Sequence, residues 1–369
     1  MSSVPSSAEA WLESLSPWPE EFGLERMRAL LAELGDPQLR FRSIHVVGTN
    51  GKTTTTLMAE AILRGEGVRA GATVSPHVRS WRERITVGDF DRAVERVRPA
   101  AERLGATQFE AVTAAAFSEL AEVGVEAAVV EAGLGGRLDA TNVLDAPVVV
   151  LTNVALEHTD VLGGTREEIA AEKLAVVTPG AVVVLCEPEW EPLARERGAA
   201  WVEVVGRANA ALAHAAAQAL LGRPADPAPA EHVQPPGRLE RRGESPLEIW
   251  DGAHNLAGLG WLLARLPARR YVVVASILRD KDAERMLAAL GAIADRIVAT
   301  RSSNPRALGA EELAALARVP AEAVDDPAEA LARARGLAGP EGAVLVTGSL
   351  YLLQDLSIQE GTYDSVETR

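Results

Sequence analysis

Short apolar runs alternate along the first two thirds of the chain with longer stretches in which apolar residues recur at helical spacing. The apolar runs occupy residues 42–48, 126–133, 147–154 and 180–186. Continuous runs of this kind are typical of strands that are buried on both faces of a parallel sheet. The stretches with helical spacing occupy residues 53–67, 109–124 and 165–177. The alternation predicts an α/β domain with a mainly parallel sheet.

The same alternation returns after a break at residues 222–237, where prolines cluster and the periodic apolar spacing stops. The break predicts a domain boundary, which we place between residues 1–235 and residues 236–369. The apolar runs of the second part occupy residues 247–253, 269–276, 295–300 and 342–349. They predict a smaller, Rossmann-like α/β domain. In both domains we expect ligands beyond the carboxyl ends of the strands.

Length and composition agree with a globular protein of two domains. A chain of 369 residues exceeds the size at which one core stops growing, and its 47% hydrophobic and 24% charged residues are ordinary values. The net charge of −15 argues against nucleic acid as a partner, and no apolar run is long enough to span a membrane. The amino-terminal residues do not have the pattern of a secretory signal, and Cys186 is the single cysteine. We therefore expect no intrachain disulfide and a reducing, cytoplasmic location.

The sequence HVVGTNGKTTTT at residues 45–56 follows a predicted strand and opens a predicted helix. Glycines let backbone N–H groups approach a phosphate, and the amino terminus of a helix favours anions. The general pattern G-x-x-x-x-G-K-[ST] does not fit, because its first glycine would fall on Val46. A glycine-rich turn with a chance lysine is the alternative to a phosphate loop. The shorter loop predicts ATP contacts from Gly48, Thr49, Asn50, Gly51, Lys52, Thr53 and Thr54.

Two polar residues follow apolar runs at the same predicted edge of the sheet. Glu131 ends one run, and a carboxylate at the end of a buried strand is costly unless it meets a cation. Metal ligation is therefore the natural interpretation of Glu131. His158 follows another run, and taken alone it is as often a satisfied structural histidine as a metal ligand.

A series of short motifs extends the pattern beyond the phosphate loop. In chain order they are GTNGK (48–52), SPH (75–77), ERI (83–85), FEAVTAAAF (109–117), EAGLGGRLDATNV (131–143), LEHTDVLGGTREEIAAEK (156–173), PPGRLE (235–240), WDGAHN (250–255), LRDKD (278–282), NPRAL (304–308) and TGSLYLL (347–353). Together they resemble folylpolyglutamate synthase and the bifunctional dihydrofolate synthase of bacteria, which belong to the Mur ligase superfamily. The resemblance implies an amino-terminal domain of the P-loop ATPase type and a carboxyl-terminal glutamate-ligase domain.

Three features depart from the pattern of that family. Thr53 and Thr54 stand where glycine and serine usually follow the loop lysine, which is closer to the Mur enzymes that build peptidoglycan. Glu157 replaces the aspartate before the motif histidine, and the segment between residues 85 and 109 is short. The first two departures are compatible with the chemistry, whereas the third bears on substrate preference.

The resemblance implies two Mg²⁺ sites beside the ATP loop. Thr53 or Thr54 could place a hydroxyl on one Mg²⁺ ion. Residues matching Ser75, Glu131 and His158 hold the second ion in the family, although imidazole is an unusual Mg²⁺ ligand. A monovalent cation, K⁺, is a further candidate cofactor.

The resemblance also implies that the second domain contributes to the nucleotide site. Arg238 and Asp251 match residues that grip ATP, His254 lies beside them, and Asn209 matches an asparagine near the adenine. Taken alone, these residues are a solvated arginine, a turn aspartate and a polar position on an ordinary helix. Contributions from two domains imply that the cleft closes on ATP and excludes water from a reactive intermediate.

Lysine is rare in this chain, since only three of the 37 Lys and Arg residues are lysine. Thr165 and Glu168 form a capping box, which predicts a helix that starts about two turns before Lys173. An ammonium beside Mg²⁺ would be repelled, whereas a primary amine can take up CO₂ and become an anionic carbamate. The resemblance implies this modification of Lys173, next to the second Mg²⁺. The alternative is an ordinary surface lysine.

The sequence therefore predicts an ATP-dependent ligase that adds L-glutamate to dihydropteroate, to tetrahydrofolate, or to both, through an acyl phosphate. Lys52, Lys173 and His158 are the candidate catalytic residues. A Mur-type ligase of cell-wall synthesis and a nucleotide-gated binding protein that hydrolyses ATP to switch conformation are the alternatives. Small molecules are the expected partners, and a monomer is expected by analogy with the family.

Overall fold

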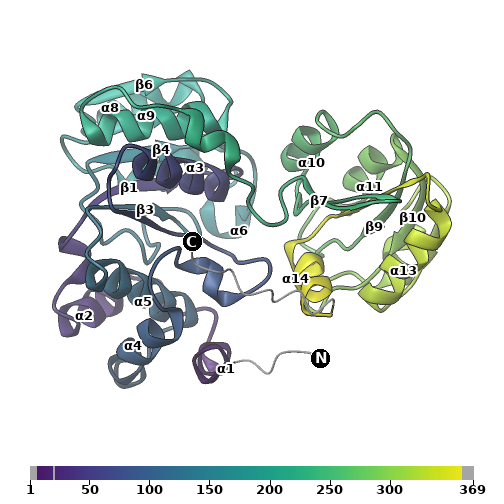
Figure 1. The fold of residues 1–369 in the computed structure, drawn as a ribbon, viewed down its shortest axis with the longest axis horizontal. Helices are drawn as coiled ribbons and strands as arrows, with labels where there is room; N and C mark the ends of the chain where they lie inside the picture. Colours follow the sequence, from purple (N-terminus) through teal and green to yellow (C-terminus); the bar gives the residue numbers. More distant parts are fainter. Residues whose placement is uncertain (1–5, 20, 360–369) are drawn as a thin grey trace. The chain divides into compact units, whose positions relative to one another are not determined.

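The structure, a computed structural model, describes residues 6–19 and 21–359. The chain divides into two compact units (Figure 1). Among the described residues, one unit contains 6–77 and 81–233, and the other contains 78–80 and 234–359. The principal change of unit, between Val233 and Gln234, falls inside the proline-rich stretch. The sequence gives no sign that residues 78–80 belong to the second unit.

Packing and charge explain the place of this short segment. Val78 is 5% exposed and belongs to the same apolar cluster as Trp250 and Leu353 of the second unit. Arg79 forms an ion pair with Glu240, which lies in that unit as well. Apolar burial and one charge pair thus assign the segment to a unit that is remote from it in sequence.

The first unit is built on a six-stranded sheet, as far as the described residues show, in the order β2-β3-β1-β4-β5-β6 with every neighbouring pair parallel. The four strands predicted from apolar runs are present as β1, β3, β4 and β5, whereas the short β2 and the partly exposed β6 were not predicted. The strand bounds are β1 Arg42–Val47, β2 Ala70–Thr73, β3 Ala127–Glu131, β4 Val148–Leu151, β5 Val182–Leu185 and β6 Trp201–Val204.

Helices cover both faces of this sheet (Figure 1). On one face α3 and α9 pack against alternate strand residues such as Ile44 and Val46, and on the other face α2, α4, α5 and α7 pack against residues such as Val47 and Val130. The helix bounds are α1 Ser7–Ser14, α2 Glu25–Glu33, α3 Lys52–Gly65, α4 Phe90–Leu104, α5 Gln108–Glu122, α6 Thr159–Leu162, α7 Arg166–Lys173, α8 Glu191–Glu196 and α9 Asn209–Leu221, with short 3₁₀ turns at Pro37–Leu39, Trp81–Arg84, Leu174–Val176, Pro188–Trp190 and Ala228–His232.

The second unit has its own six-stranded sheet within the described residues, in the order β11-β10-β9-β12-β8-β7. Among the described strands of this sheet, only β7 runs antiparallel to its neighbour, at the edge of the sheet. The strand bounds are β7 Glu240–Glu244, β8 Leu247–Trp250, β9 Tyr271–Ala275, β10 Ala294–Ala299, β11 Ala321–Ala323 and β12 Ala343–Thr347. The predicted fold class, two α/β domains with mainly parallel sheets, is confirmed.

Two layers of helices complete the second unit. The helices α10, α11 and α12 cover one face of its sheet, and α13 and α14 cover the other. Their bounds are α10 Leu256–Leu263, α11 Ala283–Gly291, α12 Ala310–Ala315, α13 Pro327–Ala338 and α14 Leu350–Gln359. No helix within the described residues combines the length and the apolar character that crossing a bilayer would require.

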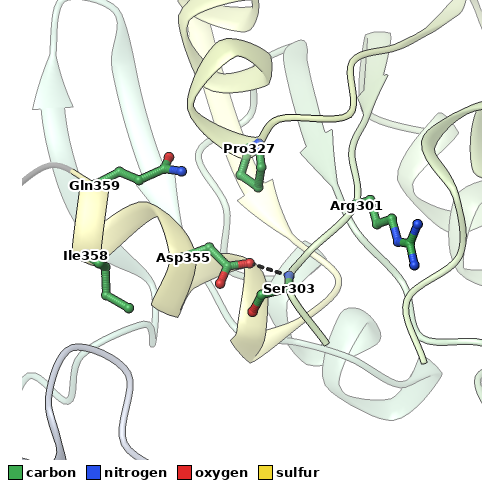
Figure 2. A pocket seen from close by; sticks show the side chains of 6 residues that line it. All are labelled: Arg301, Ser303, Pro327, Asp355, Ile358 and Gln359. Carbon is green, nitrogen blue, oxygen red and sulfur yellow. Dashed lines mark hydrogen bonds between the residues drawn. The ribbon is translucent and has the colours of Figure 1, made fainter. Parts of the chain in front are cut away.

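A pocket of about 260 Å³ lies in the second unit (Figure 2). Within it the carboxylate of Asp355 accepts a hydrogen bond of 2.7 Å from the backbone N–H of Ser303, and burial raises the pKa of Asp355. The residues predicted to bind ATP or metal do not line this pocket, which is formed by Arg301, Ser303, Pro327, Asp355, Ile358 and Gln359.

The predicted capping box at the start of α7 is confirmed. The Thr165 hydroxyl accepts from the backbone N–H of Glu168 at 3.2 Å, and the Glu168 carboxylate accepts from the backbone N–H of Thr165 at 3.2 Å. The helix then runs from Arg166 to Lys173, so that Lys173 is its last residue.

We expect Thr165→Ala to lower the free energy of unfolding by about 1 kcal/mol, because the first N–H groups of α7 lose their acceptor. Thr165→Ser keeps the hydroxyl and is the matched control, with a smaller loss. Urea unfolding followed by circular dichroism measures both changes. Equal losses in the serine and alanine variants would show that the hydroxyl does not stabilise the helix.

Candidate active site

The loop between β1 and α3 has a backbone that requires glycine at two positions. Gly48 and Gly51 have φ angles of 146° and 85°. A Cβ atom on Gly48 would lie 1.9 Å from Oγ1 of Thr152, and one on Gly51 would lie 2.6 Å from Oδ1 of Asn209. The predicted adenine-side residue, Asn209, therefore lies directly against the loop, at the start of α9.

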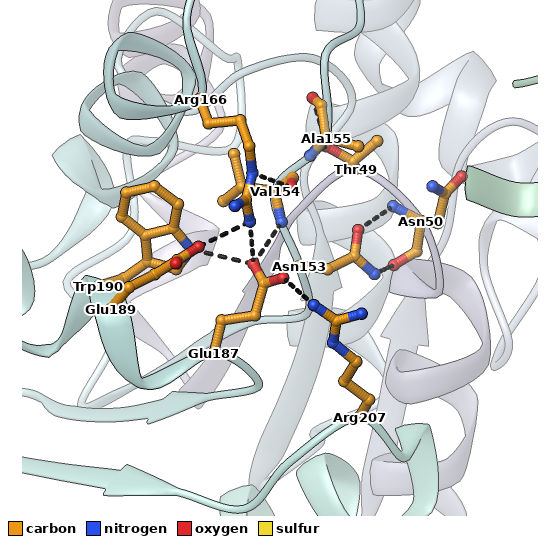
Figure 3. A network of polar contacts seen from close by, with 10 residues as sticks. All are labelled: Thr49, Asn50, Asn153, Val154, Ala155, Arg166, Glu187, Glu189, Trp190 and Arg207. Carbon is orange, nitrogen blue, oxygen red and sulfur yellow. Dashed lines mark hydrogen bonds and ion pairs between the residues drawn. The ribbon is translucent and has the colours of Figure 1, made fainter. Parts of the chain in front are cut away.

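Asn153 fixes this loop to the segment that follows β4 (Figure 3). Its side-chain oxygen accepts from the backbone N–H of Asn50 at 3.0 Å, and its side-chain nitrogen donates to the carbonyl of Asn50 at 2.9 Å. The Thr49 hydroxyl accepts from the backbone N–H of Ala155 at 3.1 Å. Asn153 was not predicted from the sequence, although a polar residue near the end of an apolar run is the signal that singled out Glu131.

Glu187 plays a similar part after β5 (Figure 3). Its carboxylate is 6% exposed and accepts from the backbone N–H of Val154 at 3.1 Å and from the Trp190 indole at 3.0 Å. Arg166 and Arg207 also donate to it, each at 3.0 Å. One buried carboxylate thus joins the segment after β4 to the start of α7. The sequence analysis missed Glu187 as well.

The predicted metal ligands Thr53, Ser75 and Glu131 come together at the end of β3. The carboxylate of Glu131, 3% exposed, accepts from the Thr53 hydroxyl at 3.0 Å. Its second oxygen accepts from the backbone N–H of Ser75, also at 3.0 Å. Thr54 follows Thr53 in the first turn of α3 and is half-buried. Oxygen atoms are the ligands that Mg²⁺ prefers, so the Thr53 hydroxyl and the Glu131 carboxylate fit that ion.

Lys173 is buried beside the phosphate loop rather than exposed on a helix surface. It is 1% exposed, and its Nζ donates to the carbonyl oxygen of Gly48 at 2.9 Å and to the carboxylate of Glu157 at 3.2 Å. Lys52 donates to the same Gly48 oxygen at 3.1 Å. The pKa of Lys173 is lowered to about 8, chiefly by burial; the charge of Lys52 adds to this shift, and Glu157 opposes it.

His158 lies one residue beyond Glu157 and immediately precedes the short helix α6. Its φ angle is 48°, a left-handed conformation that non-glycine residues seldom adopt. In the described part of the chain, no group of three or more His, Cys, Asp or Glu side chains is arranged to hold a metal ion. A metal here would therefore need oxygen ligands other than carboxylates, such as hydroxyl groups, in addition to Glu131 and His158.

The predicted nucleotide residues of the second unit lie beyond the carboxyl end of β8. Asp251 is 3% exposed and accepts from the backbone N–H groups of Leu239 at 2.8 Å and Ala253 at 2.9 Å. Burial raises the pKa of this carboxyl group. Arg238 donates to the carbonyl of Gly237 at 3.0 Å. Within this unit Asp251 therefore fixes the backbone next to two candidate residues, because Leu239 follows Arg238 and Ala253 precedes His254.

His254 and Asn255 continue the same turn. Nδ1 of His254 lies 2.8 Å from the carbonyl oxygen of Gly252. The side-chain oxygen of Asn255 accepts from the backbone N–H of Gly258 at 2.8 Å and caps α10. Asn255 thus stabilises the start of α10, a role that its sequence motif did not indicate.

Two family models match the chain, and together they cover most of it. Residues 46–219 match the Mur ligase middle domain, and residues 237–350 match the Mur ligase, glutamate ligase domain. The phosphate loop and the buried carboxylates lie within the first match, and the turn around Asp251 lies within the second. The chain is a Mur-type ligase, an enzyme of the ATP-dependent, amide-bond-forming class.

The chain belongs to the dihydrofolate synthase/folylpolyglutamate synthase family. It is 31% identical to the enzyme of that name from Bacillus subtilis, over 95% of this chain and 97% of the relative, and 31% identical to that from Escherichia coli, over 93% and 92%. The Escherichia coli FolC structure in complex with DHPP and ADP has a TM-score of 0.86 at 29% identity, over 96% of this chain and 97% of that chain. The Mycobacterium tuberculosis folylpolyglutamate synthase complexed with ADP has a TM-score of 0.87 at 29% identity, over 96% and 98%. The resemblance read from the motifs is confirmed, and it separates this chain from the cell-wall ligases.

We expect Gly51→Ala to abolish most nucleotide binding, because its Cβ would displace Asn209 from the loop. Gly67→Ala is the matched control, since Gly67 has a similar φ of 81° and open space around its Cβ. The left-handed backbone should cost each variant about 1 kcal/mol of stability. Calorimetric titration with a non-hydrolysable ATP analogue, alongside thermal melting, separates the two effects. A Gly51→Ala protein that binds the analogue as well as Gly67→Ala would contradict the assignment of the loop.

Proposed function

We propose that this protein joins the amine of L-glutamate to a carboxylate of 7,8-dihydropteroate, of tetrahydrofolate polyglutamates, or of both, using ATP. The observation that carries the proposal is the convergence of Lys52, Thr53, Glu131 and Lys173 around the loop between β1 and α3. Relatives support it: the Escherichia coli FolC structure contains DHPP and ADP, and a structure of a bifunctional folylpolyglutamate synthase/dihydrofolate synthase, 29% identical to this chain, contains Mn, AMPPNP and L-glutamate.

An amide does not form from a carboxylate and an amine at neutral pH unless the carboxylate is activated. In the proposed reaction the acceptor carboxylate attacks the γ-phosphorus of ATP, which releases ADP and gives an acyl phosphate. The amine of glutamate then attacks the acyl carbon, phosphate leaves with the electron pair of the C–O bond, and the amine loses a proton. Such phosphoryl transfer requires mainly positioning and neutralisation of charge, and no protein nucleophile.

The loop residues Gly48, Thr49, Asn50, Gly51 and Lys52 are assigned to the phosphates. Backbone N–H groups at the start of α3 favour an anion, and the Lys52 ammonium is within reach of the same place because it already meets the carbonyls of Gly48 and Thr49 at 3.1 and 3.3 Å. We assign Asn209 to the adenine side. Arg238, Asp251 and His254 are assigned to ATP from the second unit, with Asp251 acting through the backbone that it fixes.

The residues assigned to divalent metal are Thr53, Thr54, Ser75, Glu131, His158 and Lys173, distributed over two Mg²⁺ sites. Mg²⁺ bound there would neutralise the charge of the phosphate oxygens and polarise the γ-phosphoryl group. Thr53 and Glu131 are already in contact, so the chain supplies two oxygen ligands that need no large rearrangement. A K⁺ ion is a further candidate.

Lys173 is assigned to this set as a carbamate. The uncharged amine attacks CO₂, forms an N–C bond and loses a proton, so that a cation becomes an anionic oxygen ligand. Two observations support the assignment: the side chain is buried beside the phosphate loop, and a pKa of about 8 leaves part of the amine uncharged near neutral pH.

We expect Lys173→Arg and Lys173→Ala both to lose nearly all turnover, because neither side chain can form the carbamate. Added acetate should partly restore activity in the alanine variant alone, since acetate can fill the space left by the side chain with a carboxylate. Nuclear magnetic resonance in isotopically labelled bicarbonate should reveal a carbamate in the wild-type protein and none in either variant. Full activity of Lys173→Arg would contradict the assignment.

Phosphate release with purified protein tests the proposed reaction. We expect release only when ATP, L-glutamate and an acceptor carboxylate are all present, because the acyl phosphate forms on the acceptor and is consumed by glutamate. Dihydropteroate and tetrahydrofolate, each supplied as the sole acceptor, determine which folate form is used. Steady release with ATP alone would instead support a nucleotide-driven switch.

Two expectations from the sequence stay predictions within this proposal. One is the cytoplasmic location, and the other is the monomeric state. Sedimentation at micromolar protein concentration measures the second directly.

A further inference from the structure

His45 is a buried histidine to which the proposed reaction assigns no task. It lies within β1, is 0% exposed, and pairs in register with Val130 of β3 and Val149 of β4. Its side chain faces the same side of the sheet as that of Val47, because side chains alternate along a strand. Burial lowers the pKa of His45 to about 4, so the ring is neutral. A polar ring in this apolar layer requires a hydrogen-bond partner.

That partner is the hydroxyl of Thr141. Nε2 of His45 lies 2.8 Å from Oγ1 of Thr141, and the Thr141 hydroxyl donates to Oδ1 of Asp139 at 2.5 Å. A hydroxyl has one proton to donate, so Oγ1 must accept from His45. The neutral ring therefore carries its proton on Nε2. Within the described residues Nδ1 of His45 makes no hydrogen bond, which agrees with that tautomer.

Asp139 uses the rest of its hydrogen-bonding capacity to close the turn that contains it. The carboxylate is 6% exposed. Oδ2 accepts from the backbone N–H of Leu134 at 2.7 Å, and Oδ1 also accepts from the backbone N–H of Thr141 at 3.0 Å. One buried carboxylate thus joins the first and last residues of the segment 134–141. His45 fixes this turn to the central strand of the sheet.

The closed turn rests on the end of α7. The backbone N–H of Arg137 donates to the carbonyl of Glu172 at 3.1 Å, and the Arg137 guanidinium pairs with the Glu172 carboxylate at 3.0 Å. A Cβ atom on Gly136 would lie 2.6 Å from the carbonyl oxygen of Lys173. The turn therefore touches the backbone of Lys173 so closely that only glycine fits.

We infer that His45 is a positioning residue for Lys173, acting through Thr141 and Asp139 on the turn that packs against the end of α7. The strand that carries His45 leads directly into Gly48, whose carbonyl oxygen receives the Lys173 ammonium at 2.9 Å. Lys173 is thus fixed to β1 twice, by its backbone through the turn and by its side chain through Gly48. The inference rests on the proposed ligase reaction, in which Lys173 takes part.

A matched pair of variants tests the inference. Thr141→Val keeps the shape of the side chain and removes the hydroxyl, whereas Thr141→Ser keeps the hydroxyl. We expect the valine variant to lose about tenfold to a hundredfold in kcat, with the KM for ATP almost unchanged, because Lys173 is displaced while the phosphate loop is intact. The serine variant should stay close to the wild type. Wild-type kcat in a folded valine variant would overturn the inference.

A second pair addresses the other end of the chain of hydrogen bonds. The side-chain amide of His45→Gln can replace the Nε2–H donor, whereas His45→Leu cannot. We expect the glutamine variant to retain more turnover than the leucine variant at equal nucleotide affinity. A merely structural role predicts instead that turnover follows the melting temperature in both pairs, and that outcome would overturn the inference.

The tautomer gives a readout that does not depend on activity or on the folding of a valine variant. Magnetic resonance of the wild-type protein with isotopically labelled histidine should show the His45 ring, identified by the signal that vanishes in His45→Gln, as neutral with its proton on Nε2 at every pH above its pKa of about 4. A proton on Nδ1 or a charged ring would overturn the chain of donors. A wild-type protein without ligase turnover would contradict the proposed function. If the wild type is active and Thr141→Val has the same kcat, only the role of His45 is contradicted.

Discussion

The contact between Nζ of Lys173 and the carbonyl oxygen of Gly48 is the interaction on which the candidate site depends. A buried amino group is costly unless acceptors surround it, and Gly48, whose φ of 146° favours glycine, presents its carbonyl to Lys173. Lys52 uses the same oxygen, so both lysines are held by a loop that only glycine can form. The conformation of the loop and the positions of the two lysines therefore depend on each other.

Buried carboxylates supply the rigidity around this contact. Glu131 and Glu187 each follow or end a parallel strand, and each accepts a backbone N–H from a neighbouring segment in addition to side-chain donors. Asp139 does the same for the turn against α7, and Asp251 does it within the second unit. A carboxylate removed from water is stable only when such donors surround it. The donors come from segments far apart in sequence, and their convergence fixes the geometry of the loops.

Two departures from the family pattern make contacts inside the candidate site. Glu157 stands where the family has aspartate, and its carboxylate meets the Lys173 ammonium at 3.2 Å. A second departure, Thr53 in place of glycine, places a hydroxyl against Glu131 at 3.0 Å. Both changes thus add contacts inside the site without removing the residues around which it is built. They are compatible with membership of the folate ligases.

The sequence by itself determined the two α/β units, their longer strands, the glycine-rich loop after β1, the cap of α7 and the family, because these depend on local periodicity and on contiguous motifs. It did not indicate β2, β6 or the place of residues 78–80, since short strands and small packing segments carry no periodic signal. The sequence also left open whether Lys173 is a surface residue. Only the tertiary structure decided that it is buried, and only there do Asn153, Glu187, Thr141 and His45 acquire partners. Those partners lie on other strands and turns. Parallel strands are joined by long crossover connections, so these residues meet only once the sheet is assembled.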